Sequence, residues 1–164
     1  MSKFLTFLSR AARKAIHGPA EAFLLLRMAG WVLLLSVAVK VFSLPRALRL
    51  VSTKTRLSTD TPEGKIQERL ADAIDLLLKS ELFILKPICW KRAAVLHRYL
   101  ALNGIATQIL FGVRRDPDGS VNGHAWLEAG GKPILESNTP SYVVTYAFPS
   151  NETFEGDLNL LAER

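Results

Sequence analysis

Several signatures of common enzyme classes are absent from this 164-residue sequence. It has a single cysteine, Cys89, which excludes an internal disulfide and any zinc or iron–sulfur site built from several cysteines. It contains no GxGxxG or GxxxxGK(S/T) loop to hold phosphates and no HExxH zinc motif. We therefore expect the protein to use neither a nucleotide cofactor nor a metal ion.

Acidic residues are scarce in the N-terminal third of the chain. Residues 1–56 carry ten Lys or Arg and one acid, Glu21, a net charge of +9, whereas the remainder carries −3. This asymmetry is typical of chains that contact nucleic acid, an anionic membrane or an acidic peptide, and equally of a solvated helix face. No aromatic platform is interleaved with the basic residues, so we do not expect nucleic acid as a partner.

The sequence also lacks an uncharged apolar run of the about 20 residues that a membrane-spanning helix needs. Only twelve uncharged residues separate Arg27 from Lys40 in the apolar segment 20–43, and no signal-peptide cleavage site follows. We expect a buried or interfacial helix there, with a span in which Arg27 and Lys40 snorkel as the alternative. The expected location is cytoplasmic, with membrane association through the N-terminal helices as an option.

Hydrophobic periodicity changes from helical to strand-like along the chain. Helices are predicted over 2–17, 20–43, 45–52, 62–79 and 87–103, and strands over 105–114, 124–129, 132–137 and 141–148. Helices followed by an antiparallel sheet indicate an α+β fold. The turn-rich stretch 52–64 divides the chain into a basic, apolar helical region, residues 1–56, and a core, residues 57–164, which we expect to form one compact unit.

Cys89 lies in the first turn of the helix predicted over 87–103. Unpaired backbone N–H groups at a helix N-terminus favour a thiolate and can stabilise an oxyanion. A thiol nucleophile also needs a base. His97 is on the same helix, roughly 12 Å further along its axis, and His17 has no acid in the adjacent sequence to orient it. His124, at the start of a predicted strand, is therefore the candidate base.

The carboxylate that would orient His124 depends on the register of the hairpin over 124–137. A three-residue loop over 129–131 gives three favourable cross-strand pairs: Glu128 with Lys132, Trp126 with Ile134, and His124 with Glu136. A two-residue glycine turn instead pairs His124 with Ser137 and sends Glu136 to the opposite face. We expect the first register because it satisfies all three pairs.

Each candidate residue also has an ordinary structural interpretation. A lone cysteine is more often an inert apolar filler, a strand histidine more often a hydrogen-bonded structural residue, and Glu136 would then be an exposed strand-end charge. Together, however, Cys89, His124 and Glu136 supply the nucleophile, base and orienting acid of a cysteine acyl-transfer site.

The order of motifs in residues 89–137 is also that of a known family. Cys89 begins a helix, "NGIATQILFGVRR" follows, and "GHAWLE" comes next. In this order they resemble the transglutaminase-like cysteine peptidases of lasso-peptide biosynthesis, the peptidase half of the B protein. The preceding helices look like that family's N-terminal part, so the resemblance covers most of the chain. It implies a transglutaminase-like, papain-like fold.

The resemblance also implies roles for individual residues. Cys89 would be the nucleophile and His124 the general base of a triad whose third member is usually aspartate. Glu136, twelve residues after the histidine, stands at that place here. Ser137 and Asn138 are alternative orienting residues.

The implied activity is removal of the leader from a ribosomally made precursor peptide, without a cofactor. Residues 1–60 show no three-strand pattern of a leader-recognition domain, so we expect a separate recognition protein as a partner. The other implied partners are the precursor and an ATP-dependent macrolactam synthetase. The alternatives are a transglutaminase-like acyltransferase of another pathway and a non-catalytic module that binds a peptide or a membrane.

Overall fold

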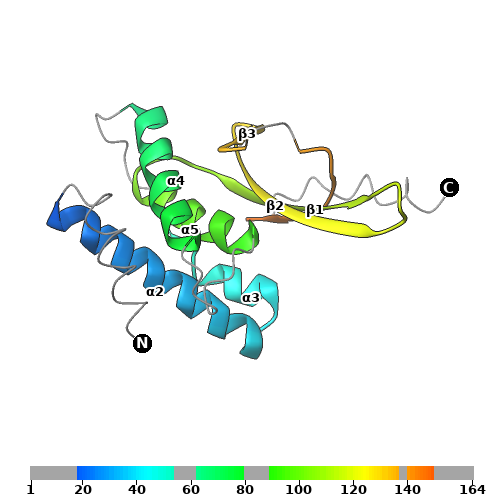
Figure 1. The fold of residues 1–164 in the computed structure, drawn as a ribbon, viewed down its shortest axis with the longest axis horizontal. Coiled ribbons are helices and arrows are strands. Elements are labelled where there is room, and N and C mark those ends of the chain that lie inside the picture. Colours follow the sequence, from blue (N-terminus) through cyan, green and yellow to red (C-terminus); the bar gives the residue numbers. More distant parts are fainter. Residues whose placement is uncertain (1–17, 54–61, 80–88, 137–139, 150–164) are drawn as a thin grey trace.

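The computed structural model describes residues 18–53, 62–79, 89–136 and 140–149 (Figure 1). Within these ranges the elements are α2 (Pro19–Val41), α3 (Leu44–Arg49), α4 (Glu63–Lys79), α5 (Cys89–Leu102), β1 (Gln108–Arg115), β2 (Val121–Ala129), β3 (Lys132–Ile134) and β4 (Val143–Phe148). Helices thus precede an antiparallel sheet, which confirms the expected α+β class. The helix expected over 2–17 lies outside the described residues.

The helix ends follow from local sequence signals. Pro19 and Pro45 lie in the first turns of α2 and α3, where the missing N–H costs no hydrogen bond. The helix expected over 45–52 ends earlier, at Arg49, because the next three N–H groups bond three residues back in a tighter turn. After the end of α5, Gly104 takes a φ of 88°, the left-handed conformation in which glycine commonly ends a helix.

Helix α5 is the centre of the fold. Nine of its fourteen residues are buried, and it contacts α2, α4, β1 and β2. Side chains from all these layers meet in one hydrophobic core, including Met28, Val32, Ile74, Leu96, Leu100, Ile109, Leu127 and Phe148. Residues on both sides of the predicted boundary at 56 therefore share a core, and the division itself stays a prediction.

The sheet has the order β3-β2-β1-β4, with every neighbouring pair antiparallel. The strands expected over 105–114 and 124–129 leave 115–123 as a loop, which is wrong, because β1 and β2 stay paired as far as Arg115 opposite Val121. The turn between them is closed by the Asp116 N–H bonding to the Ser120 carbonyl. The end of this hairpin points away from the helices (Figure 1). As a result, His124 lies inside β2 rather than at its start.

The expected register between β2 and β3 is also wrong. Ala129 pairs with Lys132 and Leu127 with Ile134, which makes Gly130-Gly131 a two-residue turn. Both glycines have positive φ, 57° and 75°. Such a turn matches the right-handed twist of the two strands, and this match outweighs the side-chain pairs that favoured a three-residue loop.

By length and composition, α2 is long and apolar enough to cross a membrane, and it is the one such helix in the described ranges. Core helices of soluble proteins and signal sequences share these properties. One side of α2 is buried in the structure, at Met28, Val32, Leu35 and Ala38. One side of α2 is therefore buried and the other is exposed, and the choice between an interfacial helix and a membrane span stays a prediction.

Candidate active site

Cys89 is the first residue of α5, and its side chain is half-buried and free. The first four N–H groups of a helix have no partner inside that helix. Residues 80–88, which precede Cys89, lie outside the described part of the chain. Cys89 is therefore the first described residue of α5, and its role at a helix N-terminus stays a prediction.

His124 and Glu136 meet, as the sequence analysis expected. The distance from His124 Nε2 to Glu136 Oε2 is 3.3 Å, and the two side chains are 28% and 19% exposed. A carboxylate oxygen accepts hydrogen bonds, so Nε2 is the donor in this contact. The other ring nitrogen, Nδ1, is left to act as an acceptor.

His124 and Glu136 meet although the observed register of β2 and β3 differs from the expected one. The backbone conformation of Leu135 explains this contact. In the observed register an uninterrupted strand would place Glu136 opposite Ala125, on the face away from His124. Leu135 instead has a φ of 59°, in the left-handed region that leucine rarely adopts. This residue ends β3 and breaks the alternation of side chains, so that Glu136 reaches His124. Backbone strain of this kind gathers at functional sites.

Arg92 connects the start of α5 to the His124–Glu136 pair. Its guanidinium binds both carboxylate oxygens of Asp75 on α4, at 2.7 and 3.2 Å. Its Nη1 lies 3.9 Å from Glu136 Oε1 and donates to the Leu135 carbonyl at 3.5 Å. Asp75, Arg92, Glu136 and His124 therefore form one chain of polar contacts. Sequence reasoning missed this chain, although the position of Arg92 three residues after Cys89 was a signal.

Aromatic rings surround His124 on its face of the sheet. Its ring stacks on Trp126, with centroids 6.0 Å apart and planes 14° apart, and lies 5.3 Å from Tyr142. The neighbouring residue Leu127 points to the other face and joins the core under α5. Among the described residues, no hydrogen bond joins Cys89 to His124, so Arg92 and Glu136 provide the contact between α5 and this face.

Gly112 is the cross-strand partner of His124, and its lack of a side chain makes room for the aromatic rings. A Cβ there would lie 2.8 Å from the Tyr142 Cβ and 3.0 Å from the edge of the Trp126 ring. We expect Gly112→Ala to lower the free energy of unfolding by about 1–3 kcal/mol, as overpacking does. Urea unfolding followed by tryptophan fluorescence measures this change.

Gly123, one residue before His124, is the matched control. A Cβ on Gly123 would meet its nearest atom, the Gly112 carbonyl oxygen, at 3.9 Å. Gly123→Ala should therefore leave the free energy of unfolding almost unchanged. Equal effects of the two substitutions would show that close packing at Gly112 is not what holds the rings around His124.

His97, which sequence reasoning set aside as a base, is a buried structural residue. Its Nδ1 lies 2.9 Å from the Thr107 hydroxyl, and its ring meets Phe148 edge-on. Burial lowers the pKa of His97 from 6.5 to about 4, and a hydrogen bond with the backbone of Thr107 opposes this shift only in part. His97 is therefore neutral at physiological pH.

The alternative orienting residues Ser137 and Asn138 lie outside the described residues.

The described residues include no group of three His, Cys, Asp or Glu side chains that could hold a metal ion. A cavity of about 470 Å³ lies between α2 and α4, lined by Leu24, Leu25, Leu76 and several charged residues. Neither Cys89 nor His124 lines this cavity. The cavity is therefore separate from the His124–Glu136 pair.

Comparison with known proteins places this arrangement in a family. A family model described as the transglutaminase-like superfamily matches residues 31–147, a span that includes Cys89, His124 and Glu136. This superfamily generally contains cysteine peptidases and acyltransferases. Searches of curated proteins and of solved structures give no match. Because the family model covers more than half of the sequence and the fold agrees, the chain belongs to the transglutaminase-like superfamily.

Proposed function

We propose that this protein is a cysteine peptidase that removes the leader from a ribosomally made precursor of the lasso-peptide class. The observation that carries the proposal is the contact between His124 and Glu136, 3.3 Å long, next to the helix that begins at Cys89. Membership of the superfamily supports thiol-based acyl chemistry. The order of motifs from Cys89 to Glu136 supports the finer assignment to lasso-peptide maturation.

In the proposed reaction the Cys89 thiolate attacks the scissile carbonyl, after its proton passes to His124 Nδ1. The N–H groups of the first turn of α5 stabilise the oxyanion of the tetrahedral intermediate. The intermediate collapses, the amine of the core peptide leaves with the proton from His124, and the leader remains as a thioester. Water, deprotonated by His124, then hydrolyses the thioester and frees the leader carboxylate and the thiol.

Glu136 holds the imidazole of His124 in the required orientation and stabilises its protonated form. Arg92 fixes Glu136 from the other side, and Asp75 in turn holds Arg92. Three residues separate Cys89 from Arg92, about 4.5 Å along the helix axis. The thiol and the Arg92–Glu136 contact are therefore both near the start of α5, and in the proposed reaction substrate binding brings Cys89 and His124 together.

The proposed partners follow from the same reaction. The substrate is the precursor peptide, and a separate leader-recognition protein delivers it. The freed amine of the core peptide is the group that a macrolactam synthetase would join to a side-chain carboxyl group. The chain itself would supply only the cleavage step.

The products of the reaction test this proposal against the acyltransferase alternative. Full-length protein is incubated with a precursor peptide and its recognition protein, with and without a large excess of a primary amine, and the products are analysed by mass spectrometry. We expect a leader with a free carboxyl group under both conditions. A leader that is quantitatively converted to the amide of the added amine would support the acyltransferase instead.

Replacement of Glu136 tests the role of the acid. Glu136→Gln keeps the size of the side chain but removes its charge, and we expect the rate of precursor cleavage to fall roughly 100-fold. The fall should be smaller than for a fully buried acid, because this pair is partly exposed. Cleavage kinetics at saturating precursor measure the effect.

Glu128→Gln is the matched control for Glu136→Gln. Glu128 is on the same strand as His124, but its carboxylate accepts a hydrogen bond from Trp126 at 3.2 Å, and a glutamine oxygen can do the same. This variant should cleave at nearly the wild-type rate. A Glu136→Gln protein as active as Glu128→Gln would remove Glu136 from the mechanism.

A further inference from the structure

Helix α2 has two apolar faces, of which the core covers one. The exposed face consists of large apolar side chains: Phe23 (60% exposed), Leu26 (71%), Leu33 (43%), Leu34 (45%), Val37 (61%) and Val41 (69%). At 3.6 residues per turn these positions fall within an arc of about 100°, on the side away from Met28 and Val32. Contiguous exposed apolar surface of this kind marks an interaction site.

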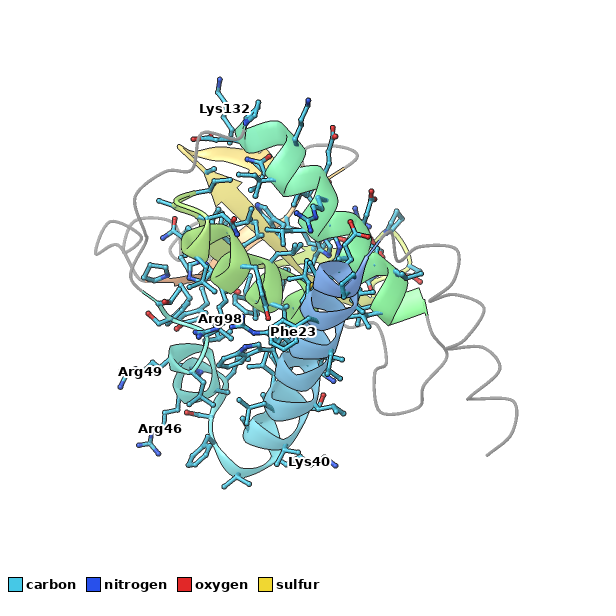
Figure 2. All side chains as sticks on the ribbon, turned by 90° about the vertical axis from the view of Figure 1, so that its left-hand side faces the viewer. Phe23, Lys40, Arg46, Arg49, Arg98 and Lys132 are labelled. Carbon is cyan, nitrogen blue, oxygen red and sulfur yellow. The ribbon has the colours of Figure 1, made fainter. Side chains whose placement is uncertain are left out.

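Positive charge borders this apolar face. Arg27 and Lys40 are exposed and lie on its two edges, and Arg46 and Arg49 of α3 are exposed beside the end of α2. Figure 2 shows Lys40, Arg46 and Arg49 pointing outward at the same end of the molecule, with Phe23 further along α2. The one acid in residues 18–53, Glu21, is on the side of α2 that faces α4, 3.9 Å from Arg69.

We propose that the exposed face of α2, with the basic residues at its end, docks the protein on an anionic lipid surface. The helix would lie in the plane of the interface, with its apolar side chains among the acyl chains and its cations at the headgroups. The buried stripe through Met28, Val32 and Leu35 stays in the protein core, so α2 docks without crossing the bilayer. The helix is about 35 Å long, which gives an extended contact.

The charges distinguish a lipid surface from a second copy of the chain. A symmetric dimer through this face would line the interface with Arg27 and Lys40 of both copies, and the face carries no acid to pair with them. Anionic headgroups neutralise the same charges. The inference does not depend on the thiol chemistry, so a Cys89→Ala protein should bind lipid as the wild type does.

Vesicle flotation tests the inference on the full-length protein. Vesicles of phosphatidylcholine mixed with phosphatidylglycerol should carry the protein to the top of the gradient, and vesicles of phosphatidylcholine alone should carry much less. Raising the salt concentration should weaken binding by screening the cations. Washing at alkaline pH should release the protein, because no helix spans the bilayer.

Two pairs of matched variants locate the contact. Lys40→Glu with Arg46→Glu and Arg49→Glu should weaken binding to the anionic vesicles roughly 100-fold, whereas Lys65→Glu with Arg115→Glu and Lys132→Glu should weaken it far less. Both triples change the net charge equally, and Lys132 lies at the opposite end of the molecule (Figure 2). Leu26→Ser with Val37→Ser should also reduce binding, and Val121→Ser with Val143→Ser should not.

Circular dichroism shows whether each variant is folded, and the exposed positions were chosen so that folding is retained. Equal binding of the two charge triples, or equal binding of the two serine pairs, would overturn the inference. Binding to neutral vesicles as strong as to anionic ones, or retention after the alkaline wash, would do the same. So would self-association through α2 with no vesicle binding.

Discussion

Cys89→Ala should reduce cleavage of the precursor peptide about 10⁴-fold or more, to the background of the assay. The sulfur is the only cysteine sulfur in the chain, so no neighbouring thiol can replace it. Without it no thioester forms, and the remaining groups can only orient the substrate. The measurement is the rate of core-peptide release, with the recognition protein present, followed by chromatography and mass spectrometry.

The same variant separates the enzyme from the binding-module alternative. Cys89 is half-buried at a helix start, so alanine should fold there without difficulty and leave the thermal unfolding temperature nearly unchanged. A folded Cys89→Ala protein that still supports maturation in cells would exclude the proposed peptidase. It would leave the membrane contact of α2 untouched, since that contact involves neither Cys89 nor His124.

The free energy of unfolding should fall by roughly 3 kcal/mol between pH 6.5 and pH 4 because of His97. Burial lowers the pKa of His97 to about 4 in the folded protein, while the unfolded chain has the ordinary value of 6.5. Between these values the unfolded state binds more protons than the folded state, so stability decreases as the pH falls. The full stabilisation is present above pH 6.5.

Urea unfolding of the wild type and of His97→Gln across this pH range measures the contribution of His97. The carboxylates titrate in both proteins, so the difference between the two stability curves isolates the histidine. The difference in the free energy of unfolding between the wild type and His97→Gln should shrink as the pH approaches 4. Parallel curves would mean that His97 does not stay neutral in the fold.

Much of the fold follows from local patterns in the sequence, such as the spacing of apolar residues and the positions of glycines. The stripe of Ile66, Leu70, Ile74 and Leu78 predicts α4 and its buried side, and the glycine at 104 predicts the end of α5. The loss of helical periodicity after residue 104 predicts β1 and the larger part of β2. These features depend on neighbours a few residues apart, which is why they could be read before the structure was known.

The details of the candidate site depend on interactions between residues far apart in the sequence, and on competition between turn geometry and side-chain pairing. The two-residue glycine turn at 130–131 sets the register of β2 and β3, although another register would have formed the favourable side-chain pairs. No sequence rule predicts that Leu135 adopts the left-handed conformation. The bidentate contact between Asp75 and Arg92 joins two helices whose crossing the sequence does not specify. Glu136 therefore contacts His124 as predicted, but through the turn at Leu135 rather than through the cross-strand pairing that suggested the contact.

The rate of alkylation of Cys89 by iodoacetamide at neutral pH, in full-length wild type and in His124→Ala, tests the central claim most directly. Cys89 is the only cysteine, so the label reports one site. If Cys89 and His124 work as a pair, the wild-type thiol should react faster than glutathione, and His124→Ala should remove that advantage. A wild-type rate no faster than glutathione and unchanged in His124→Ala would contradict the account.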